Sequence, residues 1–167
     1  MNNNELEEIL LNAGWFKGRK INIDNYMAWY QRYGFTPGIS VLKILEEYGD
    51  LTFRIPFFYE TSRSNGKRNA YWRFHITPSF FIDDSYDLSD IADSKCYISD
   101  MNRFMNLNLF PIAEAIDLDE LRYAIFMADT GEIVGAYEGS CGIIGNSFED
   151  ALNTLMTKEC AAFKYFQ

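Results

Sequence analysis

The sequence contains a single histidine, His75, and this scarcity restricts the catalytic chemistry open to the chain. A Ser-His-Asp or Cys-His nucleophile would have to use that one side chain. No nucleophile elbow precedes any serine, and His75 alternates with Arg73 along a strand-like segment, which favours an ordinary strand histidine. We therefore expect no catalytic residues and a protein that is not an enzyme.

Cysteine is equally sparse. Cys96, Cys141 and Cys160 form no CxxC pair, and an odd number of cysteines does not make a disulfide framework. Reduced thiols in a cytoplasmic protein are the simplest interpretation. Zinc-binding clusters of Cys and His are missing, and the aspartates of "DDSYDLSDIAD" do not follow the spacing of a calcium loop. We expect no metal and no cofactor.

Long apolar runs and basic residues are also scarce. No apolar run approaches the roughly 20 residues of a membrane span, and the acidic N-terminal segment "MNNNELEEILL" is unlike a secretory signal. The chain has 15 basic and 24 acidic residues, a net charge of −9 that repels nucleic acid and attracts basic partners. We expect a cytoplasmic protein that contacts neither nucleic acid nor a membrane directly.

Apolar and aromatic residues are, by contrast, abundant. Hydrophobic residues make up 48% of the 167 positions and aromatic residues 17%, which argues against disorder. A chain of this length buries a core without disulfides and suits one domain over residues 1–167.

Three N-terminal segments have helical periodicity. We expect a first helix over 4–13, a second over 24–33 capped by Asp24, and a third that is capped by Thr36 and ends before Gly49. The apolar stripe expected on the third helix consists of Ile39, Leu42, Leu45 and Tyr48.

The pattern after Leu51 is that of a sheet. Asn65-Gly66 between two β-rich runs predicts a hairpin, and a second hairpin is expected to turn at Asp129-Thr130-Gly131. A helix is expected within 87–103, between the hairpins, and a closing helix starts at a capping box of Ser147 and Asp150. The glycines of "GSCGIIG" lack a phosphate-loop continuation and are expected to serve turns. The prediction is an α+β domain whose mostly antiparallel sheet is covered by helices on one face.

An acidic strip is the most prominent candidate for function. It contains Asp83, Asp84, Asp87, Asp90 and Asp93, and the acidic end of the third helix is a candidate extension, with Glu46, Glu47 and Asp50. Such a strip is either a solvated surface that aids solubility or a docking surface for a basic protein, whose charge would speed association.

Four segments, in order along the chain, also carry a resemblance to a known family. They are "AGWFKGRKINI", "VLKILEEYGDLTF", "LFPIAEA" and the pair "DTGEIVGAYEG" and "GNSFEDALNTLM". Together they resemble the SUKH superfamily, in particular its third family, over about residues 6–157. Its members are bacterial immunity proteins found beside polymorphic toxins, and the superfamily includes a fungal cell-wall regulator. The residues that resemble the family's signature are Gly14, Trp15, Arg19, Gly49 and Leu51.

The resemblance implies a protein that binds a cognate, basic toxin domain, with a nuclease as one suitable toxin, and blocks its active site. It predicts no oligomeric state. Within it we expect Trp15 to pack the first helix onto the sheet, and Arg19 and Lys20 to cap or pair with an acid such as Asp24. Two other classes stay open: a regulatory scaffold, and a domain that binds a small molecule in an aromatic pocket. The candidate pocket residues are Tyr26, Trp29, Tyr30 and Trp72.

Overall fold

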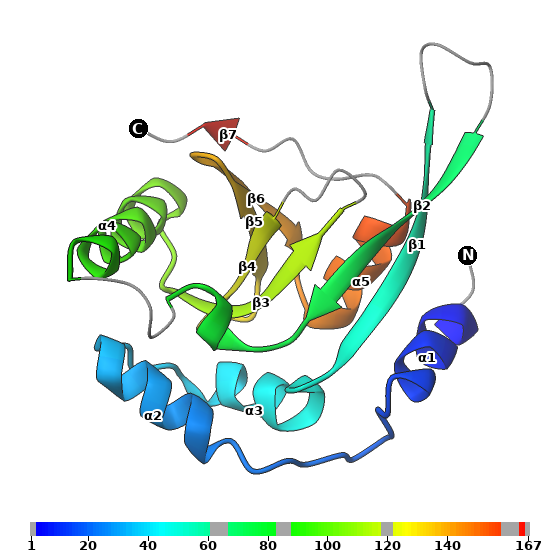
Figure 1. The fold of residues 1–167 in the computed structure, drawn as a ribbon, viewed down its shortest axis with the longest axis horizontal. Helices are drawn as coiled ribbons and strands as arrows, with labels where there is room; N and C mark the ends of the chain where they lie inside the picture. The colour runs from blue at the N-terminus through cyan, green and yellow to red at the C-terminus, as the bar shows by residue number, and fades with distance from the viewer. Residues whose placement is uncertain (1–2, 61–66, 83–87, 118–121, 158–163, 166–167) are drawn as a thin grey trace.

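The computed structural model describes residues 3–60, 67–82, 88–117, 122–157 and 164–165 (Figure 1). Its helices are α1 (Asn3–Asn12), α2 (Asp24–Tyr33), α3 (Ile39–Tyr48), the 3₁₀ turn η1 (Pro78–Phe80), α4 (Leu88–Met105) and α5 (Phe148–Thr157). Its strands are β1 (Thr52–Glu60), β2 (Lys67–His75), β3 (Leu109–Ile116), β4 (Arg122–Ala128), β5 (Ile133–Tyr137), β6 (Ser140–Gly145) and β7 (Lys164–Tyr165). The predicted α+β class is confirmed, with helices at the N-terminus, between the hairpins and after the sheet.

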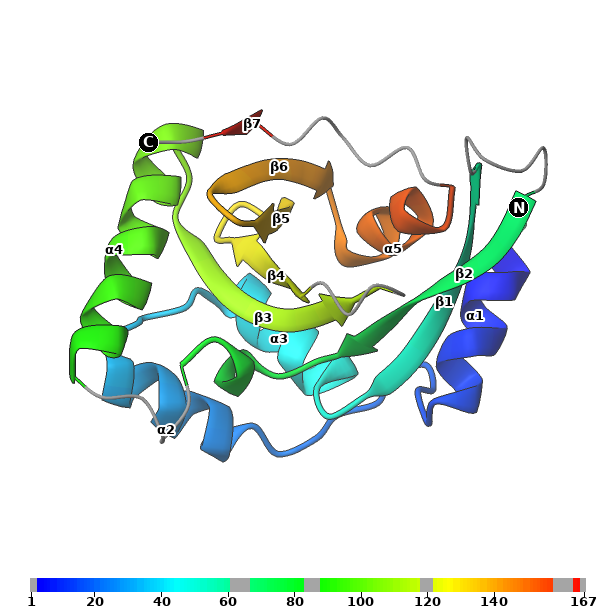
Figure 2. The same cartoon turned by 45° about the horizontal axis from the view of Figure 1, so that its top comes forward.

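The sheet is antiparallel throughout, and its strands lie side by side in chain order from β1 to β7. Each strand therefore pairs with its neighbours in chain order, although η1 and α4 are inserted between β2 and β3, and α5 between β6 and β7. The sheet is curved: β1 and β2 rise at one end, β6 lies beyond β4 and β5, and α5 lies beside the end of β6 (Figure 2). Helices α1, α2, α3 and α5 all contribute side chains to one core with the sheet.

Both predicted hairpins are present. β1 pairs with β2 from Thr52 opposite His75 to Glu60 opposite Lys67, and the turn predicted at Asn65-Gly66 lies outside the described residues. The second hairpin closes with a hydrogen bond from the Gly131 amide to the Ala128 carbonyl (3.0 Å), and Gly131 adopts the positive φ (114°) that favours glycine there. The predicted alternation of buried and exposed side chains along β2 is also confirmed. The buried members of that strand pattern are Trp72, Phe74 and Ile76, and the exposed ones are Arg73 and His75.

Helices pack on both faces of the sheet, which corrects the prediction of a single covered face. Ile125 of β4 belongs to a core that includes Leu45 of α3 and Leu152 of α5. The next residue, Phe126, points to the opposite face, where it packs with Ile98 of α4 in a second core. Side chains along a strand alternate between the two faces of the sheet. A helix that follows two strands can therefore pack on either face, and nothing in the sequence of the helix itself selects the face.

The helix starts differ from the sequence prediction. Asp24 lies in the first turn of α2 rather than capping it, and its amide donates to the Asn22 side-chain oxygen at 2.7 Å. α3 begins after Gly38, which is extended, so Thr36 is not its cap. Two members of the predicted stripe, Leu45 and Tyr48, are buried as expected. Leu42 is half-buried, and Ile39, the first residue of the helix, is 69% exposed. Val41, which the prediction left out, is buried with them.

In the segment "GSCGIIG" only the first glycine serves a turn as expected: Gly139 follows β5 with a φ of 76°, and the remaining residues form strand β6. Its last glycine, Gly145, has a structural reason to lack a side chain, because a Cβ there would lie 2.3 Å from the backbone nitrogen of Ala151. The predicted cap of α5 is present: Ser147 Oγ accepts from the Asp150 amide at 3.1 Å. The Asp150 carboxylate accepts a hydrogen bond from the Asn146 amide at 2.8 Å, one residue earlier than in the standard capping box.

Candidate partner-binding surfaces

The acidic strip is described only in part. Asp83, Asp84 and Asp87 lie outside the described residues, whereas Asp90 and Asp93 are exposed in the first half of α4. Further along the same helix, Asp100 forms an ion pair with Arg103 (3.5 Å). The N-terminal half of α4 therefore presents acidic side chains to solvent, as a docking surface requires.

The candidate extension on α3 lies elsewhere. α3 packs in the core that contains α5, and α4 packs on the other face of the sheet. Glu47 accepts a hydrogen bond from the Trp15 indole at 3.1 Å, and Asp50 accepts one from the Tyr26 hydroxyl. Glu46 is half-buried, and its carbonyl accepts from the Ile21 amide at 2.9 Å. These bonds give the acidic end of α3 a role in joining the N-terminal segments.

The family-signature residues meet at this same place, which we call the α1–α3 junction (Gly14, Trp15, Arg19, Glu47, Gly49). Arg19 donates to the carbonyls of Glu47 (2.7 Å) and Gly49 (2.9 Å), at the C-terminus of α3. A guanidinium there satisfies carbonyls that have no partner within the helix. Arg19 thus caps α3, and the pairing with Asp24 that we expected as an alternative is not its role.

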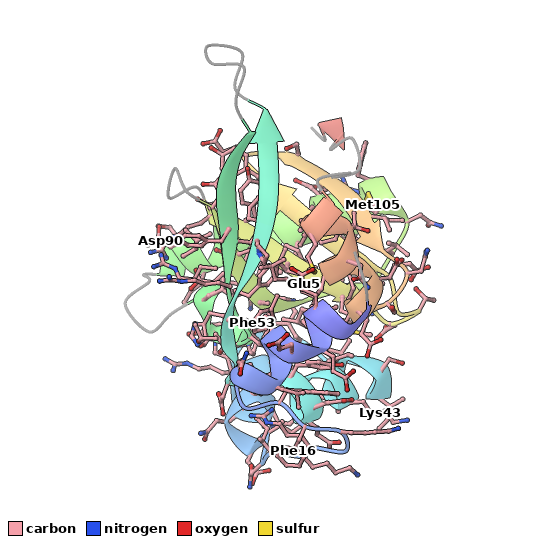
Figure 3. The ribbon with its side chains drawn as sticks, turned by 90° about the vertical axis from the view of Figure 1, so that its right-hand side faces the viewer. Glu5, Phe16, Lys43, Phe53, Asp90 and Met105 are labelled. Atoms are coloured by element: carbon pink, nitrogen blue, oxygen red, sulfur yellow. The ribbon has the colours of Figure 1, made fainter. Side chains whose placement is uncertain are left out.

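Trp15 packs on a helix rather than on the sheet. Its ring stacks on Tyr48 of α3, with centroids 6.1 Å apart and planes 11° from parallel. The chain reaches this position through Gly14, whose φ of 95° favours glycine. Phe16, by contrast, is 58% exposed at the outer end of the junction (Figure 3).

Gly49 and Leu51 complete the passage from α3 into β1. A Cβ on Gly49 would lie 2.4 Å from the Leu45 carbonyl oxygen and 2.8 Å from the Tyr26 ring, so the close packing requires glycine. Leu51 is buried, and its carbonyl accepts a hydrogen bond from the Ile76 amide at the end of β2 (3.0 Å).

The aromatic residues proposed as a pocket are core residues instead. Tyr30 is fully buried, and its hydroxyl donates to the Pro111 carbonyl at 2.6 Å. Burial raises the pKa of Tyr26 well above its ordinary value, and the hydrogen bond to Asp50 raises it further. Trp29 donates to the Ile82 carbonyl at 2.9 Å, and Trp72 packs edge-on against Tyr123. These side chains hold α2 and β2 in place, and a described cavity lined by Trp72 has a volume of only about 10 Å³.

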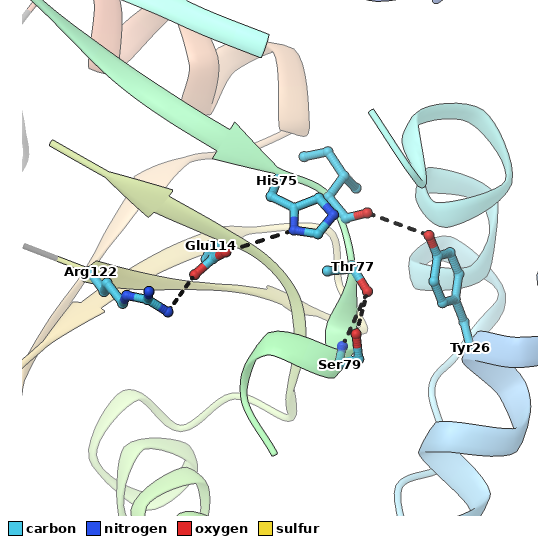
Figure 4. A network of polar contacts seen from close by, with 7 residues as sticks. Tyr26, His75, Thr77, Ser79, Glu114 and Arg122 are labelled. Carbon is cyan, nitrogen blue, oxygen red and sulfur yellow. Dashed lines mark hydrogen bonds and ion pairs between the residues drawn. The ribbon is translucent and has the colours of Figure 1, made fainter. Parts of the chain in front are cut away.

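His75 lies beside a carboxylate on the outer face of the sheet (Figure 4). Its Nδ1 is 3.7 Å from Glu114 Oε1, and Arg122 Nη1 is 3.6 Å from the other oxygen of Glu114. The nearby hydroxyls of Thr77 and Ser79 bond each other at 2.8 Å. Among the described residues, no three His, Cys, Asp or Glu side chains gather as a metal site would require.

A cleft that sequence reasoning missed opens beside this network. The cleft, which we call the α4 cleft, has a volume of about 460 Å³ and lies between η1, α4 and the outer face of β3–β5. Ala124 and Ala136, opposite each other in the β4–β5 ladder, form its floor. Because neither side chain extends beyond Cβ, the space above this pair is left unfilled. The segment "RYAIFMA" gives no sign of a cleft, because its second half is buried on both faces, and only the packing of α4 makes a cleft there.

Aromatic rings and charged side chains line the cleft. Phe81 and Tyr97 line it, with ring centroids 6.3 Å apart. Its lining also includes three carboxylates against one guanidinium, that of Arg122. The carboxylates belong to Asp93, Glu114 and Glu138. Asp93 connects the cleft to the acidic strip expected from the sequence.

A second cleft of about 400 Å³ lies between α1, α3 and α5, beside the α1–α3 junction. Glu7, Glu47 and Glu149 contribute carboxylates to it, and Lys17 contributes an ammonium group. Glu149 accepts a hydrogen bond from the Tyr48 hydroxyl at 3.3 Å. This cleft lies where helices meet, and Glu47 and Glu149 take part in the contacts that hold them together.

Two further observations bear on where the protein acts. Of the helices in the described part of the chain, none is both long and apolar enough to cross a membrane. Cys141 is buried, which raises its pKa, whereas Cys96 is exposed on α4; Cys160 lies outside the described residues.

Comparison with known proteins gives one match. A family model described as SUKH-3 immunity protein matches residues 2–158 of the chain. No curated protein and no solved structure matches it. The matched residues include all five α-helices and strands β1 to β6.

Proposed function

The chain belongs to the SUKH-3 immunity protein family, and from this premise we propose that it binds one cognate toxin and neutralises it by covering the toxin's active site. The observation that carries the proposal is the family match, because it extends over 2–158 and so includes the junction, the sheet and α4 together. Binding of this kind needs a folded, complementary surface and no chemistry of the protein's own.

The charge of the chain supports a basic toxin. A net charge of −9 attracts a cationic protein from a distance and speeds its association. Toxins that cleave nucleic acid are one class with the required positive surface, since they must bind phosphates. We propose that the complex forms in the cytoplasm of the bacterium that makes both proteins.

We further propose that the toxin docks on the α4 side of the molecule. Asp90 and Asp93 are exposed there, and the strip continues in sequence to Asp83, Asp84 and Asp87. The acids of α3 are weaker candidates, because Glu47 and Asp50 already accept hydrogen bonds inside the molecule.

Co-expression tests the proposed function. The toxin encoded beside this gene is expressed in a sensitive bacterium, with and without the chain. We expect growth to be restored only with the chain, and the two proteins to elute as one complex in size-exclusion chromatography. As a control, an unrelated acidic protein of similar size should not protect. Equal killing with and without the chain, together with no complex, would show that the proposal is wrong.

A further inference from the structure

We propose that the α4 cleft is the pocket that receives an arginine side chain of the toxin, with Glu114 as the group that binds its guanidinium. This inference rests on the proposed function, because it assigns a residue class of the partner to one place on the surface. Three observations support it: the size of the cleft, the aromatic rings that line it, and the hydrogen-bonding capacity that the Glu114 carboxylate retains.

The cleft is large enough to admit a long side chain. About 460 Å³ is open above the Ala124–Ala136 floor, and small-molecule pockets begin at about 300 Å³. The floor belongs to paired strands in the middle of a hydrogen-bonded sheet, so it is rigid. Anchor residues that fill pockets contribute most of the binding free energy of an interface, and arginine is enriched among such anchors. A rigid recess next to exposed acids is a suitable place for one.

The rings favour a guanidinium over an ammonium. Phe81 packs edge-on against Phe126 of the second core (5.3 Å between centroids) and is therefore held in place, with Tyr97 beside it. Planar guanidinium groups stack on aromatic faces and are more weakly hydrated than ammonium groups. An arginine consequently loses less hydration than a lysine on entering a cleft with aromatic walls.

Glu114 supplies the anion. Its side chain is only 14% exposed, and its two ion-pair contacts, with His75 and Arg122, are 3.7 and 3.6 Å long. Both distances exceed those of a good hydrogen bond, and a carboxylate has about four acceptor positions. Because the side chains of His75 and Arg122 are about half and three-quarters exposed, they can swing aside without disturbing the core. Glu114 thus retains capacity for a bidentate bond to a guanidinium.

A double-mutant cycle with the cognate toxin tests the assignment. Affinities are measured for Glu114→Gln and for Glu8→Gln, which removes the same charge from an exposed position on α1. We expect Glu114→Gln to raise the dissociation constant about tenfold or more, mostly through faster dissociation, and Glu8→Gln to change it less than about twofold. One surface arginine of the toxin, changed to Gln, should show coupling with Glu114 and none with Glu8. Equal effects of the two substitutions, or coupling to a lysine instead, would reject the assignment.

Two additions keep the test decisive. If Glu114→Gln is unfolded by circular dichroism, Asp93→Asn on the exposed rim replaces it, with a smaller expected loss of about threefold. If the toxin forms no complex, the proposed function fails, and a probe then tests the cleft alone. N-acetyl-arginine amide should shift the backbone NMR signals of Ala124 and Ala136, and its uncharged citrulline counterpart should not. No shift, or equal shifts with both probes, would reject the cleft as a guanidinium site.

Discussion

Arg19 shows how a charged residue that looks available for binding is used inside the fold. Its guanidinium bonds the carbonyls of Glu47 and Gly49, while Trp15 bonds the Glu47 carboxylate. The three contacts tie the segment after α1 to the end of α3, across about 30 residues of chain. Hydrogen bonds from charged donors contribute more than neutral ones, and a helix terminus left without partners is costly.

Replacement of Arg19 by alanine should therefore destabilise the protein. We expect Arg19→Ala to lower the free energy of unfolding by about 2 kcal/mol, because two charge-assisted bonds are lost. Lys20→Ala, at the exposed neighbouring position, should change it by less than about 0.5 kcal/mol. Urea unfolding followed by tryptophan fluorescence measures both. If the two variants unfold at the same urea concentration, Arg19 does not cap α3 in solution.

At the scale of elements, α5 is positioned by its approach to β6. Gly145 ends β6 and Ser147 caps α5, so the helix starts directly behind the strand. The absence of a side chain at Gly145 lets the backbone of Ala151 approach closely. Leu152 and Leu155 then enter the core, where burial of such a side chain contributes about 1.5–3 kcal/mol.

A single methyl group at this contact should separate strand and helix. We expect Gly145→Ala to lower the melting temperature by roughly 6–12 °C, since overpacking of this kind costs up to about 3 kcal/mol and each kcal/mol shifts Tm by about 2–4 °C. Asn146→Ala, next to it and exposed, is the control and should melt within about 2 °C of the wild type. Thermal unfolding followed by circular dichroism is the measurement. A melting temperature of Gly145→Ala equal to that of Asn146→Ala would contradict this close contact between β6 and α5.

At the scale of the whole molecule, the acidic side chains have two different roles. The acids at the end of α3 join elements, whereas those in the first half of α4 face solvent beside the α4 cleft. Acids of the second kind are expected to steer a basic partner most, because they are exposed to solvent on the side of the molecule that carries the α4 cleft.

Reversal of charge on α4 should slow association with the toxin more than the same reversal elsewhere. We expect the pair Asp90→Lys and Asp93→Lys to reduce the association rate about tenfold at low salt and to weaken its dependence on salt. Glu7→Lys and Glu8→Lys on α1 change the net charge equally and should reduce the rate less than about threefold. Stopped-flow mixing at several salt concentrations measures this. The same rate for both pairs would mean that net charge alone, and not the α4 surface, steers the toxin.

The sequence by itself determined most of the elements and their order, with β6 as an exception. Hairpins, buried strand faces and the α5 cap follow from signals within a few residues, such as Ser147 and Asp150 or the alternation around Trp72. The four segments that resemble the family likewise identified the class of protein that the family match shows. Local signals are strong here because turn, cap and strand patterns depend on backbone geometry that neighbouring residues decide.

Only the tertiary structure decided how those elements are used. It placed α4 on the opposite face of the sheet from α3 and brought Glu47 and Asp50 into hydrogen bonds with Trp15 and Tyr26. It also built the α4 cleft, which Asp93 and Glu114 both line although 21 positions separate them in the sequence. Face selection and clefts depend on which distant surfaces bury the most apolar area together, and no pattern within a single segment records that choice.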